Sequence, residues 1–306
     1  MTESYHRGEI AVQELAGERS QAVLNGRVLS RTIPAAARPF VGQQSSVVIG
    51  WLDASGAPWA SLVVGEPGFA SCDEGGTVVT LEATDSALPL GPPQDDIRAG
   101  DPLGMLVIDL ATRRRLRVNG LVERSMPGEL RVAVEQAFPN CPKYIQRRER
   151  VEAATTAPTA ATSASVGLPA DLPAWLSRTD TAFVVSVGPD ARLDCSHRGG
   201  RRGFMQMDGD AVLVPDYPGN SMFCSLGNMA VDPRAGLVLV DFDARQQLHL
   251  SGEVTIDMAR PDPAGRTAGT GRWWRLTPRT WAVSALAGTA HWRLVDESPF
   301  NPRVEP

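Results

Sequence analysis

The chain has 306 residues, of which 42% are hydrophobic and 21% charged, and its formal net charge is -5. This composition excludes collagen-like, disordered and coiled-coil classes. The small acidic excess gives no overall basic footprint for nucleic acid or for an anionic membrane, and the longest apolar runs are too short to span a bilayer.

The N-terminal residues are polar and lack the apolar stretch of a secretory signal. The four cysteines (Cys72, Cys141, Cys195 and Cys224) stand singly, without a C-x-x-C pair. In a chain of this length they do not indicate a disulfide framework. We therefore expect a cytoplasmic protein.

Strand patterns come first along the chain. Residues 46–53, 58–65 and 77–83 are apolar runs separated by turn residues, which is typical of β-strands. Further on, the segment Arg113-Arg-Arg-Leu-Arg-Val-Asn-Gly120 predicts another strand. Its alternation places Arg115 and Arg117 on one face.

Two helices are predicted next. Residues 127–138 carry apolar side chains at helical spacing. A second helix would begin at Asn140 or Cys141, with Pro142 at the first helical position. Lys143, the only lysine among 30 basic residues, would then lie in the first turn. A helix dipole disfavours a cation there unless an anion, from a ligand or a neighbouring Glu, is close.

Residues 152–170 are rich in Ala, Thr and Ser and show no strand or helix periodicity. We interpret them as a linker between an N-terminal domain, residues 1–151, and a C-terminal domain, residues 171–306. The C-terminal domain again opens with apolar runs between turns. Short strands of this kind predict an antiparallel barrel or sandwich.

The two domains also resemble each other in sequence, which predicts a tandem duplication. Ser61, Gly65, Gly68 and Phe69 match Ser196, Gly200, Gly203 and Phe204 without gaps, and the Asp-Pro segment at 101 matches that at 232. A duplicated barrel would form a pseudo-dimer within one chain.

The copies diverge where the first has Leu62-Val63-Val64 and the second has His197-Arg198-Gly199. One interpretation is a solvated edge strand; the other is an anion site in which Arg198 donates to a phosphate. Nearby, Asn220 would cap a short helix with Ser221 in its first turn, where free N–H groups could also bind phosphate.

Several blocks together resemble a known family. They are Pro58-Trp-Ala-Ser61, Asn140-Cys-Pro-Lys-Tyr-Ile-Gln146, Asp194-Cys-Ser-His-Arg-Gly-Gly200, Asp216-Tyr-Pro-Gly-Asn-Ser-Met222 and Asp232-Pro-Arg-Ala-Gly236. The chain resembles the pyridoxamine 5′-phosphate oxidase-related, FMN-binding split-barrel superfamily, most closely its tandem bacterial branch. The resemblance implies a mainly β fold of two split barrels in tandem with flanking helices.

The resemblance also implies an FMN site between the barrels. The second barrel would supply Ser196, His197, Arg198, Asn220, Ser221 and Gln247, and the first would supply Arg115, Arg117, Asn140, Lys143 and Tyr144. We expect one FMN per chain, because only the second copy carries the phosphate set. His197 is the one candidate for a catalytic role.

The implied activity is that of a flavin-dependent oxidoreductase acting on a small organic substrate, with oxygen or another acceptor. The C-terminal segment lacks the signature of true pyridoxamine phosphate oxidases, so that reaction is not expected. A separate reductase or NAD(P)H could supply electrons, and the chain could be a monomer or a homodimer. A flavin-binding or haem-binding protein without turnover is the alternative. No metal-ligand spacing is present.

Overall fold

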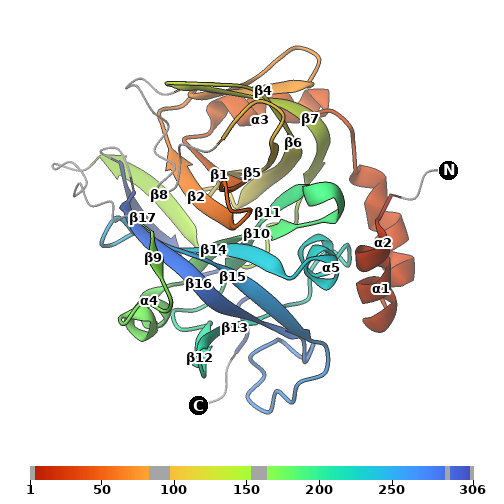
Figure 1. Ribbon diagram of the computed structural model, residues 1–306, viewed down its shortest axis with the longest axis vertical. Coiled ribbons are helices and arrows are strands. Elements are labelled where there is room, and N and C mark those ends of the chain that lie inside the picture. The colour runs from red at the N-terminus through yellow and green to blue at the C-terminus, as the bar shows by residue number, and fades with distance from the viewer. Residues whose placement is uncertain (1–3, 83–96, 153–163, 287–289, 304–306) are drawn as a thin grey trace.

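The computed structural model describes residues 4–82, 97–152, 164–286 and 290–303 (Figure 1). These residues form two large antiparallel sheets with short helices at their margins, so the predicted mainly β fold of two split barrels is confirmed. Among the described residues, no helix is long and apolar enough to cross a membrane.

The first barrel is one seven-stranded sheet with the order β2-β1-β5-β6-β7-β4-β3. Its strands are β1 (Ser46–Leu52), β2 (Pro58–Val64), β3 (Ala70–Cys72), β4 (Val78–Glu82), β5 (Pro102–Asp109), β6 (Arg114–Met126) and β7 (Glu129–Pro139). Strands β1 and β2 are apolar along their length because both of their faces are covered.

The second barrel repeats this order as β11-β10-β14-β15-β16-β13-β12, with a short extra strand on β16. Its strands are β9 (Ser165–Val166), β10 (Thr181–Val187), β11 (Leu193–Gly199), β12 (Gln206–Asp208), β13 (Ala211–Pro215), β14 (Arg234–Asp241), β15 (Gln246–Asp257) and β16 (Trp273–Ala285). The identical strand order supports the predicted duplication.

Strand register gives the equivalent positions of the two barrels. Ile49 pairs with Ser61 in the first barrel as Val184 pairs with Ser196 in the second, so Leu62 and Val63 correspond to His197 and Arg198. Likewise Met105 pairs with Val118 as Leu237 pairs with Leu250. It follows that Arg115 and Arg117 of β6 correspond to Gln247 and His249 of β15.

Each barrel encloses an apolar core, and a third apolar cluster joins them. Its members come from facing strands of both barrels and include Val48, Leu62, Leu106, Phe183 and Val238. Burial of side chains of this size contributes about 1.5–3 kcal/mol each. The barrels are therefore held face to face by a continuous hydrophobic seam.

Segments outside the sheets interlock the two halves (Figure 1). Helices α1 (Arg7–Leu15) and α2 (Arg19–Asn25) come from the first half, and α1 packs on α5 (Cys224–Val231) of the second. Gly8 and Gly227 make this crossing close, since a Cβ on Gly8 would lie 2.2 Å from the Gly227 oxygen. At the opposite side, β8 (Arg147–Glu152) pairs with β17 (Ala290–Asp296).

The remaining helices are short. They are α3 (Arg38–Gln43), α4 (Leu172–Arg178) and the 3-10 turns Gly26–Val28, Ala35–Ala37 and Pro189–Ala191. Of the predicted linker, residues 153–163 lie outside the described residues, while Ser165–Val166 pairs with β16.

Two predicted helices are wrong, and a third begins later than predicted. Residues 127–138 belong to strand β7 and its turn, because the four-residue spacing of Leu130 and Val134 also fits a period of two. The segment after Pro139 forms a turn with Tyr144 at φ 68°. The helix expected at Asn220 begins only at Cys224, because Ser221 and Phe223 adopt left-handed conformations first.

Candidate functional site

A cavity lies where β6 of the first barrel faces β11 of the second. Its volume is about 110 Å³. The first barrel contributes Arg115, Arg117, Asn140, Cys141, Lys143 and Tyr144; the second contributes β11, residues 215–223 and the start of α5. We call it the interbarrel cavity.

Strand β11 brings two predicted residues to this cavity. Its register against β10 places the side chain of Arg198 on the same face as Ser196, whose Oγ accepts from Arg198 Nη1 at 3.1 Å. Arg198 Nη1 also donates to the His197 carbonyl oxygen. Arg198 Nε and His197 Nε2 are buried and have no hydrogen-bond partner among the described residues.

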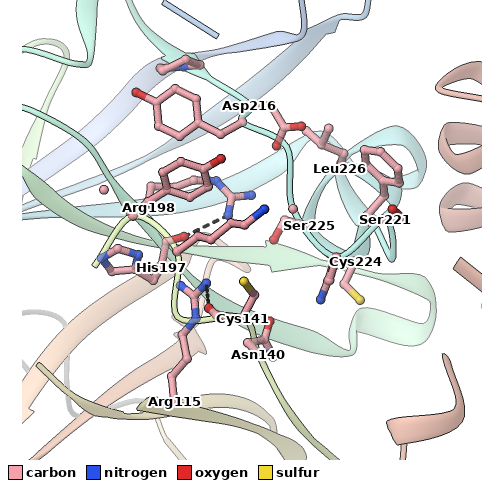
Figure 2. A pocket seen from close by; sticks show the side chains of 18 of the residues that line it. Arg115, Asn140, Cys141, His197, Arg198, Asp216, Ser221, Cys224, Ser225 and Leu226 are labelled. Carbon is pink, nitrogen blue, oxygen red and sulfur yellow. Dashed lines mark hydrogen bonds between the residues drawn. The ribbon is translucent and has the colours of Figure 1, made fainter. Parts of the chain in front are cut away.

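Strand β6 supplies the two facing arginines, which differ in how they are neutralised. Arg117 forms a two-point salt bridge with Asp194 of the other barrel, at 2.9 and 2.7 Å, and both side chains are buried. Arg115 instead donates to the Cys141 carbonyl oxygen at 2.5 Å, and its Nε has no partner within the described chain. Figure 2 shows Arg115 and Arg198 reaching into the same space from opposite barrels.

The electrostatics of the cavity favour an anion. Burial, with Arg117 and Arg198 nearby, lowers the pKa of Arg115 to about 9. Burial also lowers the pKa of Arg198, and burial together with Arg115 and Arg198 brings the pKa of His197 well below its usual value. His197 is therefore a neutral imidazole at neutral pH. Both guanidinium groups remain charged and neither forms a salt bridge with a described carboxylate, although the buried Asp216 acts electrostatically on Arg198.

The segment 215–223 forms the opposite wall. Asp216 accepts from Arg272 Nε at 3.0 Å, and burial raises the pKa of this carboxyl group. Ser221 Oγ donates to Glu18 at 2.6 Å, and Asn220 Oδ1 accepts from the Met222 N–H. Ser221, which lines the cavity, thus anchors the wall to the start of α2.

Aromatic side chains from both barrels meet at the cavity. The rings of Tyr144 and Tyr217 lie 4.6 Å apart, and Tyr144 OH donates to the Pro218 carbonyl oxygen. Lys143 lies beside them with its ammonium 5.4 Å from the Phe300 ring. A planar group bound here would therefore have both stacking surfaces and cations within its walls.

Nine of the eleven predicted site residues line this cavity. They are Arg115, Arg117, Asn140, Lys143, Tyr144, His197, Arg198, Asn220 and Ser221. Ser196 lies behind Arg198, with its Oγ 2.8 Å from that of Ser225.

Gln247 is a correction to the prediction, because it binds the backbone of Leu62 instead, through Nε2 and Oε1 at 3.1 and 2.8 Å. It lies in the equivalent groove, between β15 and β2. In the register of the repeat it occupies the position of Arg115.

Sequence reasoning missed Asp216, Tyr217 and Cys224 as lining residues. Asp216 and Tyr217 directly precede the predicted Asn220 segment, so their place in the chain was a usable signal. In the sequence Cys224 is only one of four single cysteines. Its position depends on the left-handed residue Phe223, for which no sequence signal was evident.

Comparisons with known proteins find no matching family model and no matching curated protein. Among solved structures, the chain is similar to an F420 reductase, with 17% identity over 37% of this chain and 98% of that chain and a TM-score of 0.28. A FAD-binding protein from Mesorhizobium loti gives 11% identity, 40% and 98% coverage and a TM-score of 0.27. A putative pyridoxamine 5′-phosphate oxidase from Corynebacterium glutamicum is 13% identical over 41% of this chain and 95% of that chain, with a TM-score of 0.28.

Proposed function

We propose that the protein binds FMN in the interbarrel cavity and is an FMN-dependent oxidoreductase for a small organic substrate, other than pyridoxamine phosphate. The observation that carries the proposal is the pair of buried guanidinium groups, Arg115 and Arg198, whose Nε atoms have no partner among the described residues. A buried donor without an acceptor costs about 1–3 kcal/mol, and more when charged. A phosphate would accept from both.

The donor set fits the other parts of FMN as well. Arg198 and Arg115 would hold the phosphate, with Lys143 adding charge at the cavity wall, and Tyr144 and Tyr217 offer aromatic surface to the ring. The cavity volume of about 110 Å³ is below the roughly 300–1,000 Å³ of pockets that enclose whole ligands. The ring would therefore be only partly enclosed.

When bound, FMN would supply hydride and electron transfer, while the protein sets its position and polarity. Arg117 contributes no free charge, because Asp194 neutralises it. Neutral His197 cannot donate a proton as an imidazolium near neutral pH, since its pKa is depressed by burial and by the neighbouring arginines. Its role would be a hydrogen bond from the cavity wall rather than acid catalysis.

The proposal also includes the location of the protein, its electron donor and its oligomeric state. The four cysteines are unpaired, which fits the reducing cytoplasm in which we place the protein. Substrate and electron donor, NAD(P)H or a separate reductase, would be small molecules or proteins that approach the open part of the cavity. One chain contains both barrels, so a monomer could form the complete site; a homodimer is the other arrangement.

The test is the identity and affinity of the cofactor. We expect the purified protein to release FMN, identified by mass spectrometry. We also expect FMN to bind at least about tenfold more tightly than riboflavin, which lacks the phosphate and so one charged hydrogen bond. Release of FAD or haem, or equal affinity for FMN and riboflavin, would contradict the proposal.

A further inference from the structure

A second cavity lies beside the first, under helix α1. It has a volume of about 270 Å³ and is lined by residues that include His6, Glu9, Glu135, Asp194 and Asn228. We call it the α1 cavity. Cys224, the first residue of α5, lines both this cavity and the interbarrel cavity. Figure 2 shows Cys224 at the edge of the interbarrel cavity, near Ser221 and Leu226.

Glu9 is the buried acid of the α1 cavity. Its residue is 8% exposed, and Oε2 accepts from the His6 backbone N–H at 2.9 Å. The His6 ring is 3.5 Å away. Its Nδ1 accepts from the Gly8 N–H at 3.1 Å, so Nε2 carries the proton that it shares with Asn228 Oδ1 at 2.9 Å. His6 is thus held as a neutral imidazole.

The groups around Glu9 leave it able to take up and release a proton near neutrality. His6 faces it from its own helix, Cys224 from α5, Asp194 from β11 and Arg117 from β6. Tyr5 also lies within its field. Burial is the largest effect and raises the pKa of Glu9 to about 7, although the bonds from His6 and Cys224 act in the opposite direction.

We propose that Glu9 and Cys224 form a proton path that joins the α1 cavity to the interbarrel cavity and delivers protons to the reaction of the bound flavin. This inference rests on the proposed function. Glu9 and Cys224 both line the α1 cavity, and Cys224 also lines the interbarrel cavity. Asp194 and Arg117 neutralise one another across the barrels, which leaves Glu9 as the proton-carrying group beside the thiol.

We take molecular oxygen as the electron acceptor and count the electrons and protons that its reduction needs. Molecular oxygen takes up two electrons and two protons to become hydrogen peroxide. The bound flavin, once reduced, would supply both electrons and one proton, so one further proton would have to come from the protein. The Glu9 O–H bond breaks as the Cys224 sulfur accepts that proton, while the Cys224 S–H proton passes into the interbarrel cavity. Cys224 remains a thiol, and the Glu9 carboxylate regains a proton from water.

The experiment follows reoxidation of the FMN-loaded, photoreduced protein by oxygen in a stopped-flow spectrometer. The wild-type rate should fall as pH rises through about 7, where Glu9 loses its proton. Glu9→Gln should be slower by about a hundredfold below that pH, the lower end of what a positioned proton donor contributes, and should show no step near 7. Glutamine retains the helix cap, because Gln serves at that position as Glu does.

Three further variants separate the path from a structural role. Cys224→Ser keeps an exchangeable proton and should remain fast, whereas Cys224→Ala should behave as Glu9→Gln does. Glu14→Gln changes an exposed glutamate on the same helix and should match the wild type. Cys224→Ala with wild-type kinetics would overturn the path.

A second readout needs no turnover. In the NMR spectrum of protein labelled with ¹³C at glutamate carboxyl groups, one resonance should titrate near pH 7 and be missing from Glu9→Gln. Its absence from the wild type would overturn the path. A protein that binds flavin yet reoxidises identically in Glu9→Gln would contradict the path alone, whereas one that binds no flavin would contradict the proposed function as well.

Discussion

Strands β6 and β11 form one groove between the barrels, and strands β15 and β2 form its counterpart. The first groove holds Arg115, Arg117 and Arg198; the second holds Gln247 and His249 opposite Leu62 and Val63 at the matching positions. Equivalent backbone positions therefore carry cations in one groove and neutral groups in the other.

The two grooves also differ in how their polar groups are satisfied. Gln247 binds both backbone groups of Leu62, and His249 binds the Ala60 carbonyl oxygen and Ser284 Oγ, each at 2.7 Å. All four of these hydrogen bonds are formed between residues of the chain. In the groove between β6 and β11, which we call the cationic groove, Arg115 and Arg198 instead keep buried donors without a partner in the described chain. One groove thus satisfies its polar groups by contacts within the protein, whereas the other keeps buried donors that the proposed ligand would satisfy.

The largest effect expected from this difference is on stoichiometry. The protein should bind one flavin per chain, because a phosphate set against Leu62 and Val63 would be desolvated without a cation at a cost of several kcal/mol. Titration of the apoprotein with FMN, followed by fluorescence, measures the number of sites. Two equivalent sites per chain would show that the grooves are functionally alike.

Next in size is the stability of the two interbarrel contacts. Arg117→Met leaves Asp194 as an unpaired buried charge and should lower the free energy of unfolding by about 3–5 kcal/mol. His249→Leu, at the matching position, removes two neutral hydrogen bonds and should cost about 1–3 kcal/mol. Denaturant titration gives both values. The double variant Arg117→Met, Asp194→Leu should regain much of the loss, and equal costs for the two single variants would contradict the ionic contrast.

Acid should destabilise the contacts of the groove between β15 and β2, which we call the closed groove. Burial lowers the pKa of His249 to about 4, whereas the unfolded chain has a value near 6.5. The unfolded state therefore binds a proton first, and stability contributed by the neutral imidazole is lost as pH falls from 6.5 toward 4, by about 3 kcal/mol in full. Urea titrations across this range should show a shallower slope in His249→Gln. An unchanged slope would mean that His249 is already charged in the fold.

The smallest effect is on affinity. Arg198→Ala should weaken FMN binding by about tenfold to over a hundredfold, since it removes a charged hydrogen bond worth roughly 1.5–3 kcal/mol. Val63→Ala changes the equivalent position of the closed groove and should leave affinity unchanged. Equilibrium dialysis compares the two. Unchanged affinity in Arg198→Ala would place the phosphate elsewhere.

The shared strand order of the two barrels and most residues that line the candidate site were predictable from local patterns. Apolar runs between turn residues predict the strands, and the contrast between Leu62-Val63 and His197-Arg198 identifies β11 as the polar counterpart of β2. The helix at 127–138 was not predictable in this way, because a four-residue spacing satisfies both helix and strand periods. The start of the helix after Asn220 was misplaced, because the left-handed residues Ser221 and Phe223 delay it to Cys224.

The sequence by itself determined which copy carries charge, because the residue type at each repeated position is a local property that alignment of the halves displays. Only the tertiary structure decided which side chains meet. Gln247 and Arg115 occupy equivalent positions. Gln247 hydrogen-bonds to the backbone of Leu62, whereas Arg115 lines the interbarrel cavity. Glu9 and Cys224 are brought together by the crossing of α1 and α5, which depends on close backbone contact at Gly8 and Gly227. Contacts between residues so distant in the chain are fixed by packing, which local sequence patterns do not encode.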